Sequence, residues 1–230
     1  MVKKQGLKSM FEGVMPLRHE TLQSQVHQQL RELILQGAFV PGESVTVARI
    51  AKALDVSPMP VREAISQLMA LGALTVVSGR SVGVPRLGPA ELADLRRVRI
   101  EVETTALRWA VAAADEAFID QLAGILAEME KAEEAGRVKE FIYENYKFHF
   151  AIYRYAGSPL LLDIIATLWL RITPQFHLLQ SSGHYRVSNC QHRDLLVAIS
   201  SRDTEAAVEA LKADIDSAYA VISMAIGERQ

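Results

Sequence analysis

Apolar residues recur at intervals of three and four along most of this chain, which is the spacing of one buried face of an α-helix. The pattern predicts a first helix from about Thr21 to Gln36 and two shorter helices between about 46 and 71. After Pro89 it predicts helices over 90–114, 116–135, 138–155, 159–181, 186–201 and 203–226. Only Leu74–Val77 and Val82–Val84 carry the composition of strands. The chain is therefore expected to be mainly α-helical.

The segment from Thr46 to Val84 combines two short helices, a tight turn and a small hairpin. Thr46 is a good residue to begin the first helix, and Ser57 is expected to cap the second through the backbone N–H of Met59. Pro58 then occupies the first helical position, where its missing N–H costs nothing. This order of elements is that of a winged helix-turn-helix, so the sequence predicts double-stranded DNA as a partner.

The outer face of the second short helix and the tip of the hairpin hold the candidate DNA contacts. Arg62 can pair with a guanine or a phosphate in the major groove, and Gly79 lets the backbone of the hairpin approach the duplex. The candidate DNA-binding residues are Arg62, Ser57, Met59, Ser66, Gln67, Gly79, Arg80 and Arg49. The alternative is that Arg62 is a solvated surface charge, because helix-turn-helix shapes also occur in proteins that never bind DNA.

Composition and charge divide the chain into two parts. Residues 1–86 hold ten basic and six acidic residues, a balance of +4, whereas the remainder has a balance of −6. This asymmetry fits a DNA-facing front and an acidic rear that senses a small molecule. We expect a flexible tail over 1–17, a winged helix-turn-helix domain over 18–85, a linker over 86–89 and an all-α bundle of six or seven helices over 90–230.

The compartment is expected to be the cytoplasm. The first residues are basic but no apolar stretch of signal-peptide length follows them, and no run is long enough to span a membrane. The one cysteine, Cys190, cannot form an internal disulfide, which suits a reducing compartment.

The helical half contains a set of residues with metal-binding chemistry. Asn145 and His149 are four residues apart and share a helix face, while His192 and Asp214 lie on later helices. Imidazoles and a carboxylate gathered inside a bundle suit a divalent transition metal, Zn²⁺, Ni²⁺ or Mn²⁺. The alternative is a buried His–Asp cluster that binds no ion.

Other residues of this half are candidates to hold an effector molecule. Arg99 and Arg171 can each grip a carboxylate with a planar guanidinium, although either could equally form a salt bridge. Tyr146 and Tyr153 are candidate pocket walls. We expect Trp109 and Trp169 in the core, and His177 and His184 at the surface.

From Leu22 to Val84 the chain resembles the GntR family of transcription regulators. The matching runs are I-L-Q-G-A-F-V-P-G-E at 34–43, I-A-K-A-L-D-V-S-P-M-P-V-R-E-A-I at 50–65 and L-M-A-L-G-A-L at 68–74. The resemblance implies that Arg62 contacts operator DNA and that 78–80 is the tip of the wing. The chain departs from the family at Ala48 and Pro58, where arginine is common.

The helical half resembles the FCD effector domain of the FadR-like subfamily. The similarity lies in R-I-E-V-E at 99–103, in the stretch from Asn145 to Leu160 and in the stretch from His192 to Ala207. In that family one Asp and three His bind a metal that helps to hold a small organic acid. This chain has His149 and His192, but Asn145 replaces the Asp and Asp214 falls where the third His is expected.

Together these features predict a DNA-binding transcription regulator, a repressor of metabolic genes that acts as a homodimer on a pseudo-palindromic operator. A small carboxylate metabolite, assisted by a metal, is expected to modulate DNA binding, and no membrane partner is expected. Two other classes of protein are the alternatives. One is a metal-dependent hydrolytic enzyme that uses the His/Asp cluster, although no general base or nucleophile motif accompanies the cluster. The other is an architectural DNA binder without a ligand.

Overall fold

The first helix, α2 (Leu22–Leu35), crosses the small N-terminal domain. The computed structural model describes residues 21–79 and 81–227. Thr21 begins α2, and its hydroxyl accepts a hydrogen bond from the backbone N–H of Ser24 at 3.1 Å. The buried residues are Val26, Leu30, Ile34 and Leu35. Leu22 and Leu33 are exposed, because α2 packs on α4 along the line through residues 26, 30 and 34.

The helix-turn-helix consists of α3 (Val47–Ala53) and α4 (Pro58–Ala70). Thr46 caps α3 as predicted, accepting from the N–H of Arg49 at 3.2 Å. Ser57 occupies the N-cap position of α4, but its side chain makes no capping hydrogen bond, so that prediction is wrong. Pro58 and Pro60 lack N–H groups, which removes two of the first three donors that a cap can use. Val61, Ile65 and Leu68 of α4 are buried at the helical spacing of its apolar face.

The wing is a three-stranded antiparallel sheet in the order β1-β3-β2. The sequence predicted the strands β2 (Thr75–Ser78) and β3 (Ser81–Gly83), each within a residue or so of its observed bounds, but missed β1 (Ser44–Thr46). A three-residue strand is too short to show alternation. Val45 pairs with Val82 on the edge of β3 opposite to β2. Gly83 permits this close approach, because a Cβ there would lie 2.5 Å from the carbonyl oxygen of Glu43.

The remaining described residues form a helical domain, and the predicted fold class is confirmed. Its elements are α5 (Pro89–Ala113), α6 (Glu116–Glu134), α7 (Val138–Tyr155), α8 (Pro159–Ile172), the 3₁₀ helix η1 (Thr173–Ser182), α9 (His184–Ser200) and α10 (Thr204–Gly227). The sequence predicted one helix over 159–181. The α-helix instead ends at Ile172, because Pro174 lacks the N–H that an α-helical turn would use. Within the described ranges, no helix is both apolar and long enough to cross a bilayer.

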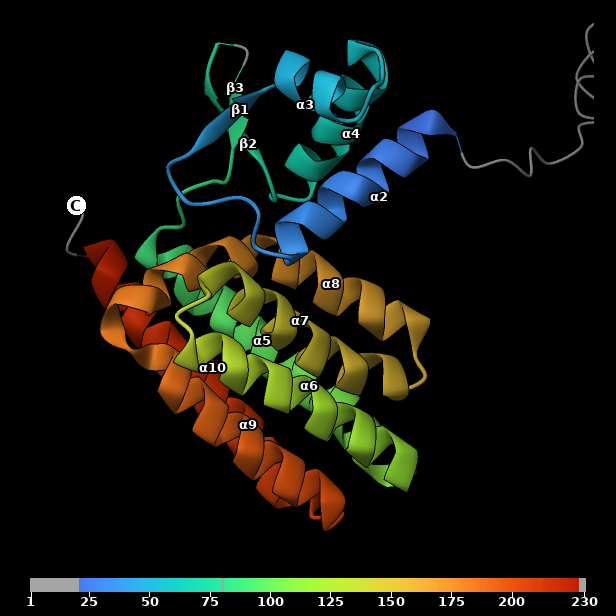
Figure 1. The fold of residues 1–230 in the computed structure, drawn as a ribbon, viewed down its shortest axis with the longest axis vertical. Helices are drawn as coiled ribbons and strands as arrows, with labels where there is room; N and C mark the ends of the chain where they lie inside the picture. Colours follow the sequence, from blue (N-terminus) through green and yellow to red (C-terminus); the bar gives the residue numbers. More distant parts are fainter. Residues whose placement is uncertain (1–20, 80, 228–230) are drawn as a thin grey trace, which may run out of the picture.

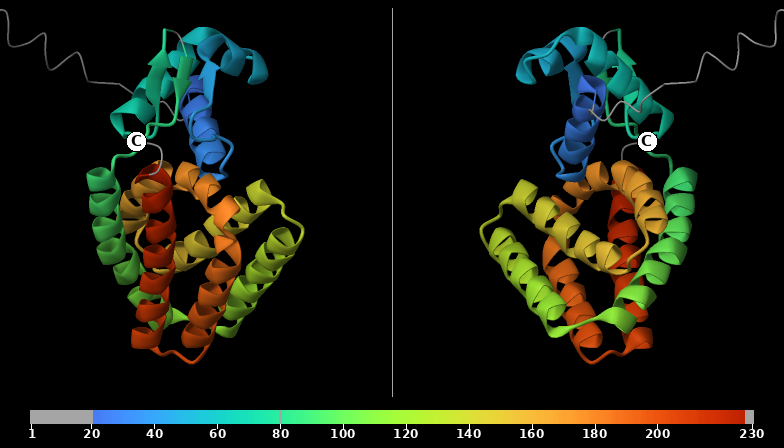
Figure 2. Two further views of the ribbon diagram at one scale, coloured as in Figure 1. Left: turned by 90° about the vertical axis from the view of Figure 1, so that its left-hand side faces the viewer. Right: turned by 90° about the vertical axis from the view of Figure 1, so that its right-hand side faces the viewer.

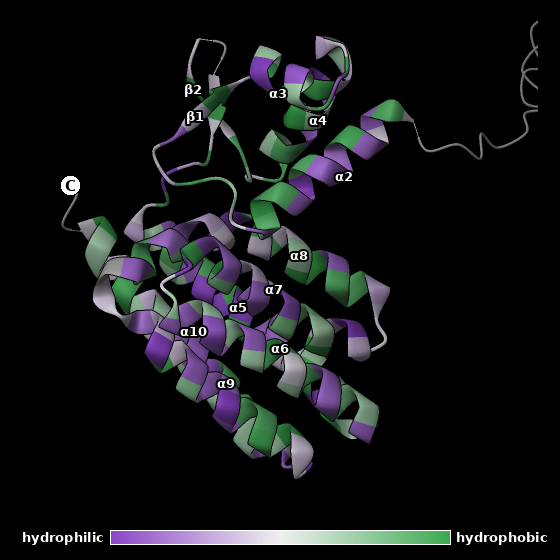
Figure 3. Cartoon of the chain, viewed as in Figure 1, coloured by the Kyte–Doolittle hydropathy of each residue, from purple (hydrophilic) through white to green (hydrophobic). Residues whose placement is uncertain are grey.

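The winged domain sits on one end of the helical domain (Figures 1 and 2). The lower end of α2 contacts α8 and η1, so the two domains meet there. Hydrophobic and hydrophilic residues alternate around most helices in Figure 3, as expected when one face of each helix is buried. Trp169 is fully buried, as predicted. Trp109, which we also expected in the core, is 49% exposed on the outside of α5.

Candidate functional site

The first candidate site is the exposed surface of α4 and the wing beside it. Met59, Arg62, Ser66 and Gln67 all project from the outer face of α4, and Met59 is 64% exposed. A hollow of about 230 Å³ separates α4 from the wing, and its lining includes Arg62, Ser66 and Gly79. The fold thus brings predicted DNA-binding residues from α4 and from the wing to one surface.

Three other predicted DNA contacts have different surroundings. Arg49 is exposed on α3, but it borders an apolar groove between α2, α3 and residues 38–45 rather than the hollow beside Arg62. Ser57 is exposed at the start of α4. Arg80 lies outside the described residues. Arg62, Ser66 and Gly79 therefore form the part of the predicted set that shares one surface.

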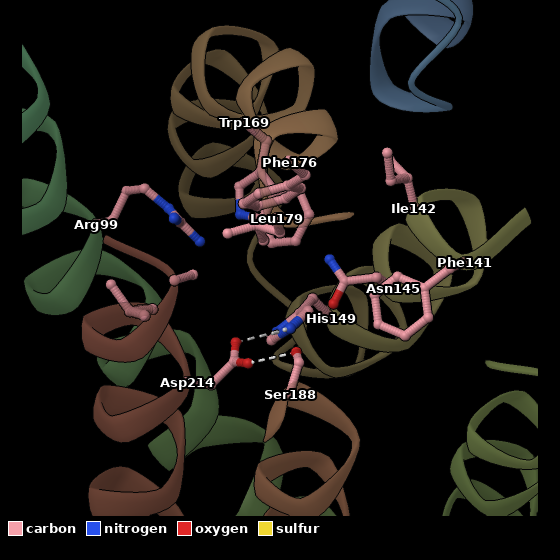
Figure 4. A pocket seen from close by; sticks show the side chains of 12 residues that line it. Arg99, Phe141, Ile142, Asn145, His149, Trp169, Phe176, Leu179, Ser188 and Asp214 are labelled. Atoms are coloured by element: carbon pink, nitrogen blue, oxygen red, sulfur yellow. Dashed lines mark hydrogen bonds and ion pairs between the residues drawn. The ribbon is translucent and has the colours of Figure 1, made fainter. Parts of the chain in front are cut away.

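The second candidate site is a buried polar cluster assembled from three helices. His149 of α7 and His192 of α9 point their Nε2 atoms at each other, 3.0 Å apart. Asp214 of α10 lies beside both, with Oδ2 at 3.4 Å from His149 Nε2 and Oδ1 at 3.6 Å from His192 Nε2. Ser188 of α9 donates to Asp214 Oδ1 at 2.9 Å. Figure 4 shows Asn145 facing the same space from α7.

Burial and the neighbouring groups set the charges of this cluster. Burial would raise the pKa of Asp214, but His192, His149 and the Ser188 hydroxyl outweigh it and lower that pKa. Burial lowers the pKa of His192 to about 4, against the opposing effect of Asp214. The cluster near pH 7 is therefore a carboxylate beside a neutral imidazole, the protonation states that bind a cation.

The geometry of this cluster fits a divalent metal. Bonds from zinc to nitrogen or oxygen are about 2.0–2.1 Å, so two donors in a tetrahedral shell lie about 3.3 Å apart. The two Nε2 atoms are 3.0 Å apart, and each has one Asp214 oxygen close to that value, Oδ2 at 3.4 Å from His149 and Oδ1 at 3.6 Å from His192. The donor atoms of His149, His192 and Asp214 all lie within 4.8 Å of one another. Two imidazoles and one carboxylate are also a donor set that zinc accepts.

A small cavity adjoins the cluster. It has a volume of about 20 Å³, which is room for one or two water molecules. The polar side chains that line it are Arg99, Asn145, His149, Ser188 and Asp214, and the apolar ones include Phe141, Ile142, Trp169, Phe176 and Leu179. Any organic ligand would have to displace part of this lining.

Arg99 reaches the cavity, but its charge is already balanced by Glu103. The Arg99 Nε donates to Glu103 Oε1 at 2.6 Å, and its guanidinium lies over the ring of Trp169 at 5.2 Å. Glu103 is fully buried. Neither Glu103 nor Ser188 is among the site residues predicted from the sequence. The signal for Glu103 was present, since a charged pair four residues apart sat within an apolar stripe of α5.

The remaining candidates do not line the cavity. Arg171 lies near the other domain, where a Cβ at Gly72 would be 3.4 Å from its Nε. Tyr146 is buried, and its hydroxyl accepts from Arg154 at 3.1 Å. Tyr153 lies behind His149, with its hydroxyl 3.2 Å from His149 Nδ1. Helical periodicity explains the position of Arg171, because it is two residues beyond Trp169 and so projects from another side of α8.

The two histidines expected at the surface are not there. His184 is buried, 3.4 Å from the Ser217 hydroxyl. His177 is partly buried, and its Nε2 lies 2.7 Å from the carbonyl oxygen of Gly37, in the winged domain. The chain does break at Gly183, but η1 packs against the bundle and holds His177 beside Gly37, while His184 is the first residue of α9 and is buried where α9 packs on α10.

Comparison with known proteins agrees with both halves of this description. Residues 22–84 match the family described as "Bacterial regulatory proteins, gntR family", and residues 94–217 match the FCD domain. The regulator McbR of Escherichia coli is 30% identical over 196 residues, 84% of this chain and 89% of McbR. The solved structure of McbR superposes with a TM-score of 0.81 and covers 90% of this chain.

Two further proteins extend the comparison. The repressor GlaR of Escherichia coli is 28% identical and covers 87% of this chain, with 95% of GlaR aligned. A structure titled the metal-free FCD domain of TM0439 is 24% identical, with a TM-score of 0.53 over 63% of this chain and 99% of that one. The latter likeness shows the fold alone.

Proposed function

The chain belongs to the GntR family of bacterial regulatory proteins and carries an FCD domain, and from this premise we propose how its two domains work together. It is a transcription regulator whose N-terminal domain binds DNA and whose C-terminal domain is of the effector-binding type. In our proposal residues 18–85 bind the operator, residues 86–89 link the domains and residues 90–230 bind effector and partner. It acts as a repressor of metabolic genes in the cytoplasm.

The operator contacts are assigned to the surface around Arg62. Arg62 and Ser66 project from α4 into the hollow beside the wing, where they can reach base edges while α4 lies in the major groove. Gly79 lies on the same hollow, at the tip of the hairpin. Met59 and Gln67 extend the same exposed helix face. Arg49 is left for a phosphate contact, because it borders a different groove.

A divalent metal is assigned to His149, His192 and Asp214, with Asn145 beside them. The spacing of the three donor groups supports this assignment. A bound metal would supply a positive charge to which the carboxylate of a small organic acid can bind. Arg99 is a weaker partner for that acid than the sequence suggested, because Glu103 already accepts its hydrogen bonds.

One observation carries the coupling between effector and DNA. Ile142 lines the small cavity, and the same side chain packs against Gly37 at the end of α2, where a Cβ would lie 2.7 Å from Ile142 Cγ2. His177 holds the Gly37 carbonyl from the neighbouring η1. Because the cavity is so small, a ligand of several atoms can enter only if the side chains that line it move. Movement of Ile142 would displace α2 and with it the helix-turn-helix.

The homodimer is assigned to the outer side of the helical domain. The neighbouring helices α5 and α8 expose large apolar side chains, Val98 and Trp109 on α5 and Leu160 and Ile164 on α8. Exposed apolar side chains of this size on adjacent helices suit burial against a second copy. A dimer held there would present two copies of α4 to one operator.

Two other functions are tested against this proposal. A hydrolytic enzyme would need a general base beside the metal ligands, and turnover by the purified chain that His149→Ala abolishes would favour it. An architectural DNA binder would show the same DNA affinity whether or not metal and small acids are present. The homologous regulators support the regulatory function over both.

The decisive experiment is to purify the full chain and identify what it retains. Native mass spectrometry and elemental analysis should find one divalent metal and one small carboxylate per chain. Duplexes selected from a randomised pool should yield a palindromic sequence, and adding the identified acid should change its affinity. A chain that selects no sequence at low salt would overturn the proposal.

A further inference from the structure

A second layer of polar residues lies behind His149, centred on Glu103. This carboxylate accepts from four donors. Its Oε1 accepts from Arg99 Nε at 2.6 Å and from Trp169 Nε1 at 3.1 Å. Its Oε2 accepts from an Arg99 terminal nitrogen at 3.2 Å and from the Tyr153 hydroxyl at 2.5 Å. A carboxylate offers about four lone-pair sites, so this one is saturated.

The protons of this network can be assigned by counting donors. Glu103 forms a salt bridge with Arg99, and its carboxylate oxygens can only accept, so the single hydroxyl proton of Tyr153 points to Glu103. The Tyr153 oxygen then has only lone pairs left for His149 Nδ1, 3.2 Å away. For this contact to be a hydrogen bond, His149 has to carry its proton on Nδ1.

We propose that Glu103 and Tyr153 are positioning residues that fix the tautomer of His149 so that its Nε2 lone pair faces His192 and Asp214. The inference rests on the proposed metal site. In a metal-binding imidazole, a hydrogen bond from one ring N–H commonly fixes the tautomer and leaves the lone pair of the other nitrogen for the metal. Here a tyrosine hydroxyl makes that bond, and Glu103 holds the tyrosine with its proton turned away.

The same network restricts the orientation of the imidazole. Tyr153 is one helical turn beyond His149 on α7, so its hydroxyl reaches Nδ1 without any rearrangement of the helix. The Trp169 ring packs against His149 at 5.1 Å between ring centres, and its indole N–H is anchored on Glu103. Glu103 thus holds both a hydrogen-bond partner and a packing neighbour of His149. His192 has no such support, since its Nδ1 is buried without a hydrogen-bond partner among the described residues.

Tyr153→Phe is the first test, because it removes the hydroxyl and keeps the ring. Nitrogen-15 NMR of the imidazoles in chelator-treated full-length protein reports which nitrogen of each histidine is protonated. We expect the wild type to show His149 protonated on Nδ1, and Tyr153→Phe to shift that population toward Nε2. His192 should be little affected. A wild-type His149 protonated on Nε2 would overturn the inference.

Glu103→Gln tests the same assignment of protons by reversing the direction of the Tyr153 hydroxyl. Arg99 Nε and Trp169 both donate to the Oε1 position, so the amide oxygen should stay there and the NH₂ should face Tyr153. Tyr153 would then accept from the amide and donate to His149 Nδ1, which moves the imidazole proton to Nε2. If this variant does not fold, because Arg99 has lost its counter-charge, Tyr153→Phe alone decides.

Metal affinity supplies the second readout. Titration with Zn²⁺ should show Tyr153→Phe binding about 10–100-fold more weakly than the wild type, the usual effect of losing such an outer hydrogen bond. Tyr155→Phe, on the same helix but stacked on Phe118, should bind as the wild type does. Equal affinities for Tyr153→Phe and wild type would overturn the positioning role. A wild type that binds no Zn²⁺ would instead overturn the proposed metal site. The NMR measurement would still decide whether Tyr153 sets the tautomer of His149.

Discussion

The proposed recognition surface of α4 and the buried cluster of the helical domain are built in opposite ways. Arg62, Ser66, Met59 and Gln67 are exposed on a single 13-residue helix, and only Gly79 is added by the wing beside it. His149, His192 and Asp214 come from three helices and are all buried. The first surface depends on local helix geometry, whereas the second exists only when α7, α9 and α10 are packed together.

This difference determines how each site responds to substitution. An exposed side chain such as Arg62 can be removed with little effect on folding, so its loss reports on DNA binding alone. Removing a member of the buried cluster leaves its partners buried without a hydrogen bond, so ligand binding and stability change together. The experiments below use that contrast, and each needs a stability measurement beside the functional one.

Loss of the metal should be the largest effect. The double variant His149→Ala, His192→Ala removes two of the three converging donors, and we expect it to retain no stoichiometric metal after purification. Elemental analysis of wild type and variant provides the measurement. The single variant Asn145→Ala is the comparison, because an amide is a weak ligand, and it should keep most of the metal. Equal metal content in the double variant and the wild type would place the ion elsewhere.

Loss of the dimer should be next. Leu160→Asp with Ile164→Asp puts charge on the exposed apolar side of α8, and sedimentation analysis should show a monomer in place of a dimer. Operator affinity should then fall by about 10²–10⁴-fold, because the second half-site no longer gains from the first. Leu22→Asp, an exposed leucine on α2, is the control and should leave the dimer intact. A dimer that survives both α8 substitutions would refute this placement.

Removing the main base contact should have a smaller effect. Arg62→Ala is expected to cost about 1–3 kcal/mol of operator binding per half-site and to leave the melting temperature unchanged. Fluorescence anisotropy with the selected duplex measures the first, and thermal unfolding the second. Arg97→Ala, exposed on α5 far along the chain, is the matched control. Unchanged affinity in Arg62→Ala would move the recognition surface away from α4.

Weakening the contact between the domains at Ile142 should have the smallest effect on DNA binding, one that is confined to the response of that binding to metal or acid. Ile142→Ala should lower the free energy of unfolding by about 2–5 kcal/mol, as for other buried isoleucines. The buried Ile152 of the same helix provides a control with a similar loss. Only Ile142→Ala should reduce the change in DNA affinity that Zn²⁺ or the identified acid produces, because Ile142 packs against Gly37 and Ile152 does not. An equal response in the two variants would exclude this route.

Much of the winged domain could be predicted from the sequence because its signals are local. Thr46 begins α3, Pro58 opens α4, and Val61, Ile65 and Leu68 mark its buried face. The failures there are equally local in cause. Ser57 lacks its capping bond beside two prolines, and β1 is only three residues long. The helix boundaries of the second domain followed from the same periodicity, except where Pro174 ends α8.

The cluster was predicted in part, since His149, His192 and Asp214 were named and they do converge. Arg171 and Tyr146 were named for the effector and do not line the cavity, while Glu103 and Ser188 were overlooked. Sequence spacing shows which residues share a helix face, but it does not show which face of one helix meets which face of another. Trp109 illustrates the limit, because its apolar character predicted burial and half of it is exposed.

The order of residues alone fixed the helices, the wing strands β2 and β3, the division into a basic front and an acidic rear, and the outward direction of Arg62. These depend on contacts within a few residues of each other. Packing between distant helices decided the rest. It joined two imidazoles with one aspartate, placed a saturated glutamate behind them and set Ile142 between the cavity and α2. Such contacts join positions tens of residues apart, and their geometry arises only when the helices close around a shared interior.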